Sequence, residues 1–257
     1  MRPAYGSHAE PAVVLISPCR HPRHMETTSG DNHQYSWLGE VLPGPGSRIL
    51  DAGCGRGELA AELARRGHGV TAIDVSEAAV AASRASGVPA LRADLADYYD
   101  DEPFDAVVMS LSLHHMHPLE TVLDRASALL GPDGVLVLDE FAWDWANAAA
   151  ATWFYDAASL LAAAGLADFP REAGRDPVTR WREAHEDHAT GAAMLAAVTE
   201  RFEMADVRRE PYLSRYIGGK LTNGDTELVN ELWRIERERI ASGTLPPTGL
   251  RLTARRM

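Results

Sequence analysis

ILDAGCGRGELA, residues 49–60, is the stretch that decides the fold. An apolar strand pattern runs from Ile49 to Ala52 into a glycine-rich turn, and a helix pattern begins at Glu58. Glycine lets the backbone of such a turn come close to a ligand, and the helix that follows offers its N-terminus to a negative group. The stretch therefore predicts a nucleotide or nucleoside site at the end of a parallel strand.

The composition of the 257-residue chain excludes several classes of partner. The formal net charge is -12, without the clustered Lys and Arg that nucleic acid or an anionic membrane surface requires. The two cysteines, Cys19 and Cys54, cannot build a disulfide framework and indicate a reducing compartment. The sequence shows neither a signal-peptide core nor a membrane span. We therefore expect a cytoplasmic protein with a small-molecule partner, no nucleic-acid partner and no membrane partner.

Strand and helix patterns alternate between residues 47 and 141, which is typical of a parallel sheet with crossover helices. Residues 142–190 break this rhythm with alanine-rich helical sequence, so we expect a helical lid, or substrate insertion, after strand five. Residues 1–34 lack periodicity and are expected to form a mobile arm before a single domain, 35–257. The expected strands are 48–52, 70–74, 89–94, 104–113, 135–141, 203–213 and 249–256.

Acidic residues decide which nucleotide the turn suits. Asp51 lies two residues before Gly53, and Glu58 stands where a dinucleotide-binding turn has its third glycine. At about 4 Å and an effective dielectric constant near 20, a carboxylate costs a pyrophosphate roughly 4 kcal/mol and favours an ammonium by a similar amount. A ligand with an ammonium group and no phosphate therefore fits this turn better.

Two further acids extend the site. Asp74 ends the second strand, where a carboxylate can accept hydrogen bonds from both ribose hydroxyls, and Asp94 ends the third, within reach of an adenine amino group. Parallel strands bring their carboxyl ends to one edge of the sheet, so the three acids should converge. A ligand with ribose, adenine and an amino-acid part but no phosphate is S-adenosylmethionine.

The motifs DAGCGRG, AIDVS, RADL, FDAVVMSLSLHHM and GPDG with VLVLDEF, in this order, resemble the class I S-adenosylmethionine-dependent methyltransferases. The resemblance implies an α/β, Rossmann-like, seven-stranded and mostly parallel sheet with helices on both faces and residues 249–256 as its one antiparallel strand. It also implies the cofactor residues: Asp51, Gly53, Gly55 and Gly57 near the methionine part, Asp74 near the ribose, Asp94 and Leu95 near the adenine, and Ser110 again near the methionine, with Val75 as a further cofactor-binding residue.

The catalytic candidates are His114 and Glu140, near the ends of strands four and five, where the transferable methyl group should lie. Each could act as a base or orient the acceptor, although a base is needed only when the acceptor must lose a proton. The simpler role for each is structural, His114 by packing or bonding its loop and Glu140 by capping a segment or anchoring the lid.

The stretch TRWREAHEDH, residues 179–188, would place Trp181, His185 and His188 on one face of a helix. This face could close over a substrate or simply pack. HEDH is one residue short of the HExxH zinc motif and no further ligand is evident, so no metal is expected. The aromatic residues at the start of the insertion could line an acceptor pocket or form the core of the lid: Trp143, Trp145, Trp153, Phe154 and Tyr155.

The function that these patterns favour is transfer of a methyl group from S-adenosylmethionine to a small molecule. One alternative is a sensor or scaffold protein that binds the cofactor without transferring its methyl group. Another is a nicotinamide-dependent oxidoreductase on the same kind of sheet, which Asp51 and Glu58 disfavour. The identity of the acceptor, the atom that is methylated and the oligomeric state stay open.

Overall fold

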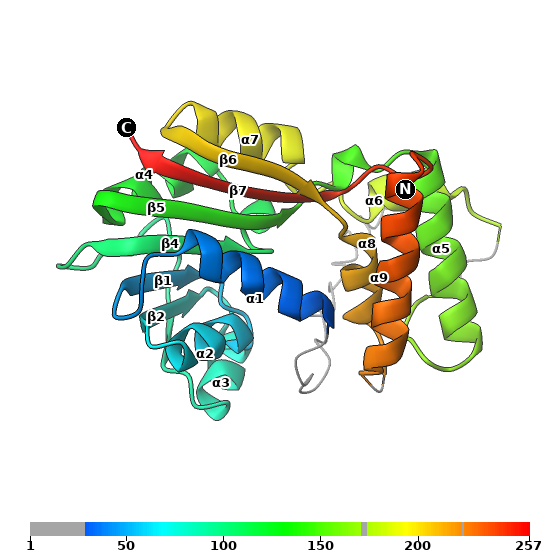
Figure 1. The fold of residues 1–257 in the computed structure, drawn as a ribbon, viewed down its shortest axis with the longest axis horizontal. Helices are drawn as coiled ribbons and strands as arrows, with labels where there is room; N and C mark the ends of the chain where they lie inside the picture. Colours follow the sequence, from blue (N-terminus) through cyan, green and yellow to red (C-terminus); the bar gives the residue numbers. More distant parts are fainter. Residues whose placement is uncertain (1–28, 171–173, 223) are drawn as a thin grey trace, which may run out of the picture.

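The computed structural model describes residues 29–170, 174–222 and 224–257. Figure 1 shows a twisted sheet with helices on both faces and a further group of helices beside one end of it. The strands are β1 (Arg48–Ala52), β2 (Gly69–Asp74), β3 (Ala90–Arg92), β4 (Phe104–Ser110), β5 (Leu130–Phe141), β6 (Phe202–Glu210) and β7 (Gly249–Arg256). The α-helices are α1 (Ser29–Val41), α2 (Glu58–Arg65), α3 (Glu77–Ala85), α4 (Leu119–Leu129), α5 (Ala148–Ala163), α6 (Pro177–Glu183), α7 (Gly191–Thr199), α8 (Leu213–Gly218) and α9 (Thr226–Ala241), and the short 3₁₀ turns are η1 (Leu113–His115) and η2 (Trp143–Trp145).

The sheet has seven strands in the order β3-β2-β1-β4-β5-β7-β6. The pairs from β3 to β5 are parallel, while β7 runs antiparallel to both β5 and β6. The predicted fold is thereby confirmed, including the antiparallel strand at residues 249–256. The chain moves outward from β1 in both directions, so the carboxyl ends of β1 and β4 flank a switch point, where ligands bind in open α/β sheets.

Both faces of the sheet are covered by amphipathic helices. On one face, α1 and α2 pack on β1, β4 and β5, with Trp37, Leu59 and Leu63 buried there. Leu59 and Leu63 lie one turn apart, which explains why this segment forms a helix against the sheet. On the other face, α4 and α7 contribute Leu123 and Met194 to the largest core cluster. These two layers hold the strand ends rigidly in place.

The group of helices beside the sheet, here called the helical unit, consists of α5, α6, α8 and α9 (Figure 1). It has a core of its own, in which Phe154, Trp181, Leu213 and Ile217 are buried. Two segments build it, residues 142–190 after β5 and residues 211–248 between β6 and β7. The predicted insertion at 142–190 was therefore incomplete. The helix α8 has six residues, too few for a helical period to appear in the sequence, and it follows a strand that ends earlier than expected, at Glu210.

Two other expectations about local structure differ from the observed fold. The helix expected to carry Trp181, His185 and His188 ends at Glu183, and both histidines lie in the loop that follows. At the other end of the chain, α1 begins at Ser29, inside the segment expected to be a mobile arm, while residues 1–28 lie outside the described residues. Among the helices described, none has the length and apolar character needed to cross a bilayer.

Candidate functional site

The glycine turn after β1 takes a backbone shape that other residues rarely adopt. Gly53 and Gly57 have φ values of 81° and 86°, in the left-handed region. A Cβ atom on Gly53 would lie 2.4 Å from the Cβ of Ser112, and one on Gly57 would lie 2.4 Å from the Oγ of Ser83. The turn is therefore pressed between the loop after β4 and helix α3. Around Gly55 the space is open, with no atom within 4 Å of such a Cβ.

Asp51 is a buried carboxyl group at the end of β1, only 1% exposed. Burial, and next the charge of Asp74, raises its pKa to about 7, against which a hydrogen bond from the backbone of Ala60 acts. Its Oδ2 atom is buried and has no hydrogen-bond partner. A buried carboxylate oxygen of this kind needs a donor or a cation, so the site is suited to an ammonium group.

Asp74 ends β2 and is shaped by the turn beside it. Its Oδ2 accepts a hydrogen bond of 2.9 Å from the backbone N–H of Gly55, and its Oδ1 one of 2.8 Å from that of Ser76. These bonds fix the carboxylate while each oxygen keeps a second lone pair. The structure thus orients Asp74 toward the cavity with the acceptor capacity that ribose hydroxyls require.

The predicted adenine residues follow β3. The Oδ1 of Asp94 accepts a bond of 2.9 Å from the backbone N–H of Ala96, and Leu95 is buried beside it. Val75 is 60% exposed, an unusual state for an apolar side chain at a strand end, and it offers a flat apolar surface to a bound ring. These side chains come from two neighbouring strands and border one space.

One cavity of about 1790 Å³ runs along the carboxyl edge of the sheet. Eight of the nine predicted cofactor residues line it: Asp51, Gly53, Gly55, Asp74, Val75, Asp94, Leu95 and Ser110. The ninth, Gly57, instead starts α2 and packs on α3. Single-ligand pockets have volumes of roughly 300–1,000 Å³, so this cavity has room for a cofactor and a second molecule.

The catalytic candidates His114 and Glu140 form a hydrogen-bonded pair at the far end of this cavity. Nδ1 of His114 lies 2.6 Å from Oε2 of Glu140, and both side chains are buried. The other carboxylate oxygen, Oε1, accepts bonds from the backbone N–H groups of Ser112 and Leu113. Glu140 thus anchors the loop after β4 and orients His114. Of the two, only His114 lines the cavity.

Trp181, His185 and His188, which were expected on one face of a helix, also lie at this end of the cavity but are not on one helix. His185 and His188 line the cavity from the loop after α6, and their rings lie near that of His114, with centroids 5.1 Å apart between His114 and His188. Trp181 is buried and packs on His185 at 4.5 Å. Burial lowers the pKa of His185 to about 4, so this imidazole is neutral at pH 7.

The aromatic residues expected either to line a pocket or to form a core take the second role. Phe154 is buried in the core of the helical unit, Trp143, Trp153 and Tyr155 pack against that core, and Trp145 packs on the core of the sheet. None of the five lines the described part of the cavity. The aromatic wall consists instead of Tyr35 and Trp37 of α1, Phe141 at the end of β5, and Tyr212, Tyr216 and Trp233 of the helical unit.

The wall residues from the helical unit were missed by sequence reasoning. Residues 208–213 were expected to end a strand, and no element was expected over residues 214–220, although the glycine pair at 218–219 indicates a turn region. In the structure, Phe141 and Tyr212 stack with ring centroids 4.3 Å apart. The far end of the cavity is therefore lined by aromatic rings and imidazoles, and the near end by acids.

Taken together, the sheet order, the glycine turn and the acids near three strand ends are typical of the Rossmann-like fold of S-adenosylmethionine-dependent methyltransferases. A family model described as a methyltransferase domain matches residues 23–176, and the chain belongs to this family. The resemblance noted in the sequence is confirmed, as is the cofactor class. Membership of this family argues against the alternative function of a nicotinamide-dependent oxidoreductase.

Known proteins similar to the chain agree with this assignment. An uncharacterized methyltransferase from Mycobacterium tuberculosis is 37% identical over 114 residues, which is 42% of this chain and 58% of that protein. The chain thus spans little more than half the length of this curated relative.

Among solved structures, an S-adenosylmethionine-dependent methyltransferase from Mesorhizobium loti has a TM-score of 0.54 at 22% identity, covering 87% of this chain and 97% of that one. A geranyl diphosphate C-methyltransferase from Streptomyces coelicolor, solved with Mg²⁺, geranyl diphosphate and S-adenosyl-L-homocysteine, has a TM-score of 0.56 at 17% identity, covering 88% and 79%. At these identities the likeness concerns the fold.

Proposed function

We propose that this chain transfers a methyl group from S-adenosylmethionine to a small-molecule acceptor. The observation that carries the proposal is the single cavity of about 1790 Å³, which joins the acidic cofactor end to an aromatic and imidazole-lined end. A cavity of this size, against roughly 300–1,000 Å³ for one ligand, accommodates two small molecules side by side.

The cofactor end acts by charge and by shape. The unpaired Oδ2 of Asp51 would receive the ammonium group, and the open space above Gly55 would leave room for the amino-acid part. Asp74 would accept the ribose hydroxyls, and Val75 would lie against the adenine ring, near Asp94. When bound, the cofactor supplies an activated methyl group, so the protein has mainly to position the acceptor and exclude water.

The acceptor end would bind a compact, partly apolar molecule. Phe141 and Tyr212 offer stacked aromatic surface, while His114 presents an imidazole held by Glu140. The loop that carries His114 touches the cofactor turn, because Ser112 packs on Gly53 and its hydroxyl donates a bond of 2.7 Å to the backbone oxygen of Ala52. An acceptor beside His114 would therefore lie next to the reactive end of the cofactor.

The helical unit closes this end of the cavity and would set the choice of acceptor. It supplies Tyr212, Tyr216 and Trp233, and it is tied to the sheet by Arg215, which contacts Asp139 at 2.9 Å. The geranyl diphosphate enzyme, which has a similar fold, binds a small acceptor, and this supports a small molecule here as well. The same proposal includes that the helical unit acts as a lid over the bound acceptor.

Two measurements test the proposal in sequence. Calorimetry with S-adenosylhomocysteine should show binding that Asp74→Ala weakens and that Asp101→Ala, an exposed acid outside the cavity, leaves unchanged. Incubation with methyl-labelled S-adenosylmethionine and a metabolite extract should then give a labelled small product, identified by mass. Label found only in macromolecules would refute a small acceptor, and cofactor binding without any labelled product would favour the sensor or scaffold alternative.

A further inference from the structure

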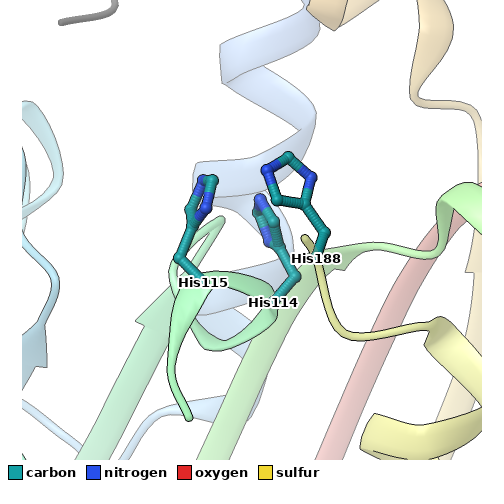
Figure 2. Close-up of side chains that lie close together, drawn as sticks. All are labelled: His114, His115 and His188. Carbon is teal, nitrogen blue, oxygen red and sulfur yellow. The ribbon is translucent and has the colours of Figure 1, made fainter. Parts of the chain in front are cut away.

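Three imidazole rings converge at the acceptor end of the cavity (Figure 2). His114 and His115 stand on η1 after β4, and His188 reaches in from the loop between α6 and α7. One nitrogen atom from each ring lies within 4.8 Å of the other two. The sequence predicted no metal because these histidines lie in segments far apart along the chain.

The approach of the two segments is built into the backbone. The N–H of Ala189 donates a hydrogen bond of 2.8 Å to the carbonyl oxygen of His114, and Nε2 of His117 lies 3.2 Å from the carbonyl oxygen of Asp187. Each bond joins a residue next to one imidazole with a residue of the opposite segment. The spacing of the three rings therefore follows from the fold and does not depend on side-chain rotation alone.

Glu140 sets the state of one ring. With Nδ1 of His114 donating to the buried Oε2 of Glu140 at 2.6 Å, Nε2 carries the free lone pair. A carboxylate behind an imidazole is the usual support of a metal-binding histidine, because it fixes the ring and makes it a better ligand. The carboxylate is itself held by the backbone of Ser112 and Leu113, so this support is rigid.

Nitrogen atoms without partners mark the same place. Nδ1 of His188 is buried and has no hydrogen-bond partner, and neither has Nε2 of His185, a residue only 2% exposed. The rings of these two histidines are 5.5 Å apart. A buried polar atom left without a partner is unfavourable, and two at one site indicate that a bound species completes it.

We propose that His114, His115 and His188 bind a divalent transition-metal cation of the zinc type, with its open position facing the acceptor. Zinc binds imidazole nitrogen at about 2.1 Å, so tetrahedral ligand atoms lie about 3.4 Å apart, and the three nitrogens, which lie within 4.8 Å of one another, need to close by at most about 1.4 Å. Three nitrogen ligands and one open position are the pattern of catalytic zinc sites. The site lines the cavity, so the cation has a path of entry.

This inference rests on the proposed function, because it also names the class of acceptor: a small molecule whose hydroxyl oxygen binds the metal. Metal binding lowers the pKa of such a hydroxyl, and its proton leaves to solvent. A lone pair of the oxygen then forms the bond to the methyl carbon while the carbon–sulfur bond breaks. The electron pair of that bond stays on sulfur, giving S-adenosylhomocysteine, and the metal keeps its oxidation state.

The test uses the full chain, freed of any affinity tag and of metal by chelator, and equilibrated with ZnCl₂ in dialysis. We expect one zinc per chain. Glu140→Gln, which removes only the support of His114, should lower the zinc affinity about 10- to 100-fold. His188→Ala and His115→Ala, which each remove a ligand, should lower it by more. His68→Ala, a histidine outside the cavity, is the matched control and should bind as the parent does. Cobalt in place of zinc should give a visible absorption band that His188→Ala abolishes.

Histidines at positions 8, 21, 24 and 33 can also bind metal weakly, which is why each variant is compared with the parent chain. S-adenosylhomocysteine calorimetry on each variant reports whether the cofactor site is still folded. Zinc binding that is equal in the parent and His188→Ala, with cofactor binding intact, overturns the metal site. Methyl transfer that continues unchanged after chelation overturns the role of the metal and leaves the proposed function standing. Zinc binding without a small methylated product overturns the proposed function and leaves the metal site standing.

Discussion

Replacing Asp51 by Asn should stabilise the empty protein and weaken its hold on the cofactor. Burial, and next the charge of Asp74, raises the pKa of Asp51 from 3.8 to about 7. Between these two values the folded chain keeps a proton that the unfolded chain has lost, so the free energy of unfolding falls as pH rises. The ionised carboxylate of Asp51, which the proposed cofactor contact requires, therefore destabilises the ligand-free protein at pH 8.

The size of the effect follows from the pKa difference. Each pKa unit corresponds to about 1.4 kcal/mol, so a shift of about three units lowers the free energy of unfolding by up to about 4 kcal/mol at pH 8. At about 2–4 °C per kcal/mol for a chain of this size, Asp51→Asn should unfold about 8–16 °C above the parent at pH 8. The gap should narrow steadily toward pH 5, where Asp51 is protonated in the folded parent.

The assay is thermal unfolding of both chains from pH 5 to pH 8.5, paired with S-adenosylhomocysteine calorimetry at pH 8. Loss of a charge-assisted hydrogen bond of about 1.5–3 kcal/mol should weaken binding about 10- to 150-fold in Asp51→Asn. Asp101→Asn, exposed and outside the cavity, should change neither quantity. A stability gap that does not depend on pH would refute the raised pKa, and unchanged affinity would refute the contact with the ammonium group.

Three further changes test the frame around the site by chemical denaturation. Gly57→Ala should lower the free energy of unfolding by more than about 1 kcal/mol, because its Cβ would lie 2.4 Å from an α3 side chain. Gly87→Ala, at a similar φ but with open space around it, should lose less. Equal losses in the two variants would contradict the clash. Glu236→Ala should lose at least about 3 kcal/mol, since its buried carboxylate accepts from three backbone N–H groups at the start of α8, while exposed Glu238→Ala should lose at most about 1 kcal/mol. Phe154→Ala should lose about 3–5 kcal/mol with S-adenosylhomocysteine affinity unchanged, because Phe154 belongs to the core of the helical unit and does not line the cavity; a large loss of affinity would instead give it a role in the site.

The sheet, and the residues that bring acids to the edge of the cavity, could be predicted because their signals are local. The central strands are short apolar runs, the turn after β1 carries its glycines, and a carboxylate such as Asp74 stands at the end of its own strand, so one window of sequence contains both the element and the polar group. The N-cap of α3 is also a local feature: Ser76 stands directly before the helix and accepts from the backbone N–H of Ala79.

The acceptor end could not be predicted because its residues meet only in three dimensions. His114 and His188 are brought together by the backbone hydrogen bond from the N–H of Ala189 to the carbonyl oxygen of His114. No sequence pattern in either segment indicates such a bond. The short helix α8 exists because the buried Glu236, from a distant helix, binds its first N–H groups. Local pattern contains neither fact, so the helical unit was placed in residues 142–190 alone.

The two ends of the cavity therefore recognise their ligands by different physics. The cofactor end places Asp51, Asp74 and Asp94 at one edge of the sheet, so it selects a cationic molecule by charge. The acceptor end sets neutral imidazole and stacked aromatic rings against each other, and such surfaces select by shape and by coordination. Asp139 also lines the cavity beside Phe141, but it is paired with Arg215 and Arg251. We therefore expect shape and coordination, rather than the charge of the acids, to decide which acceptor binds.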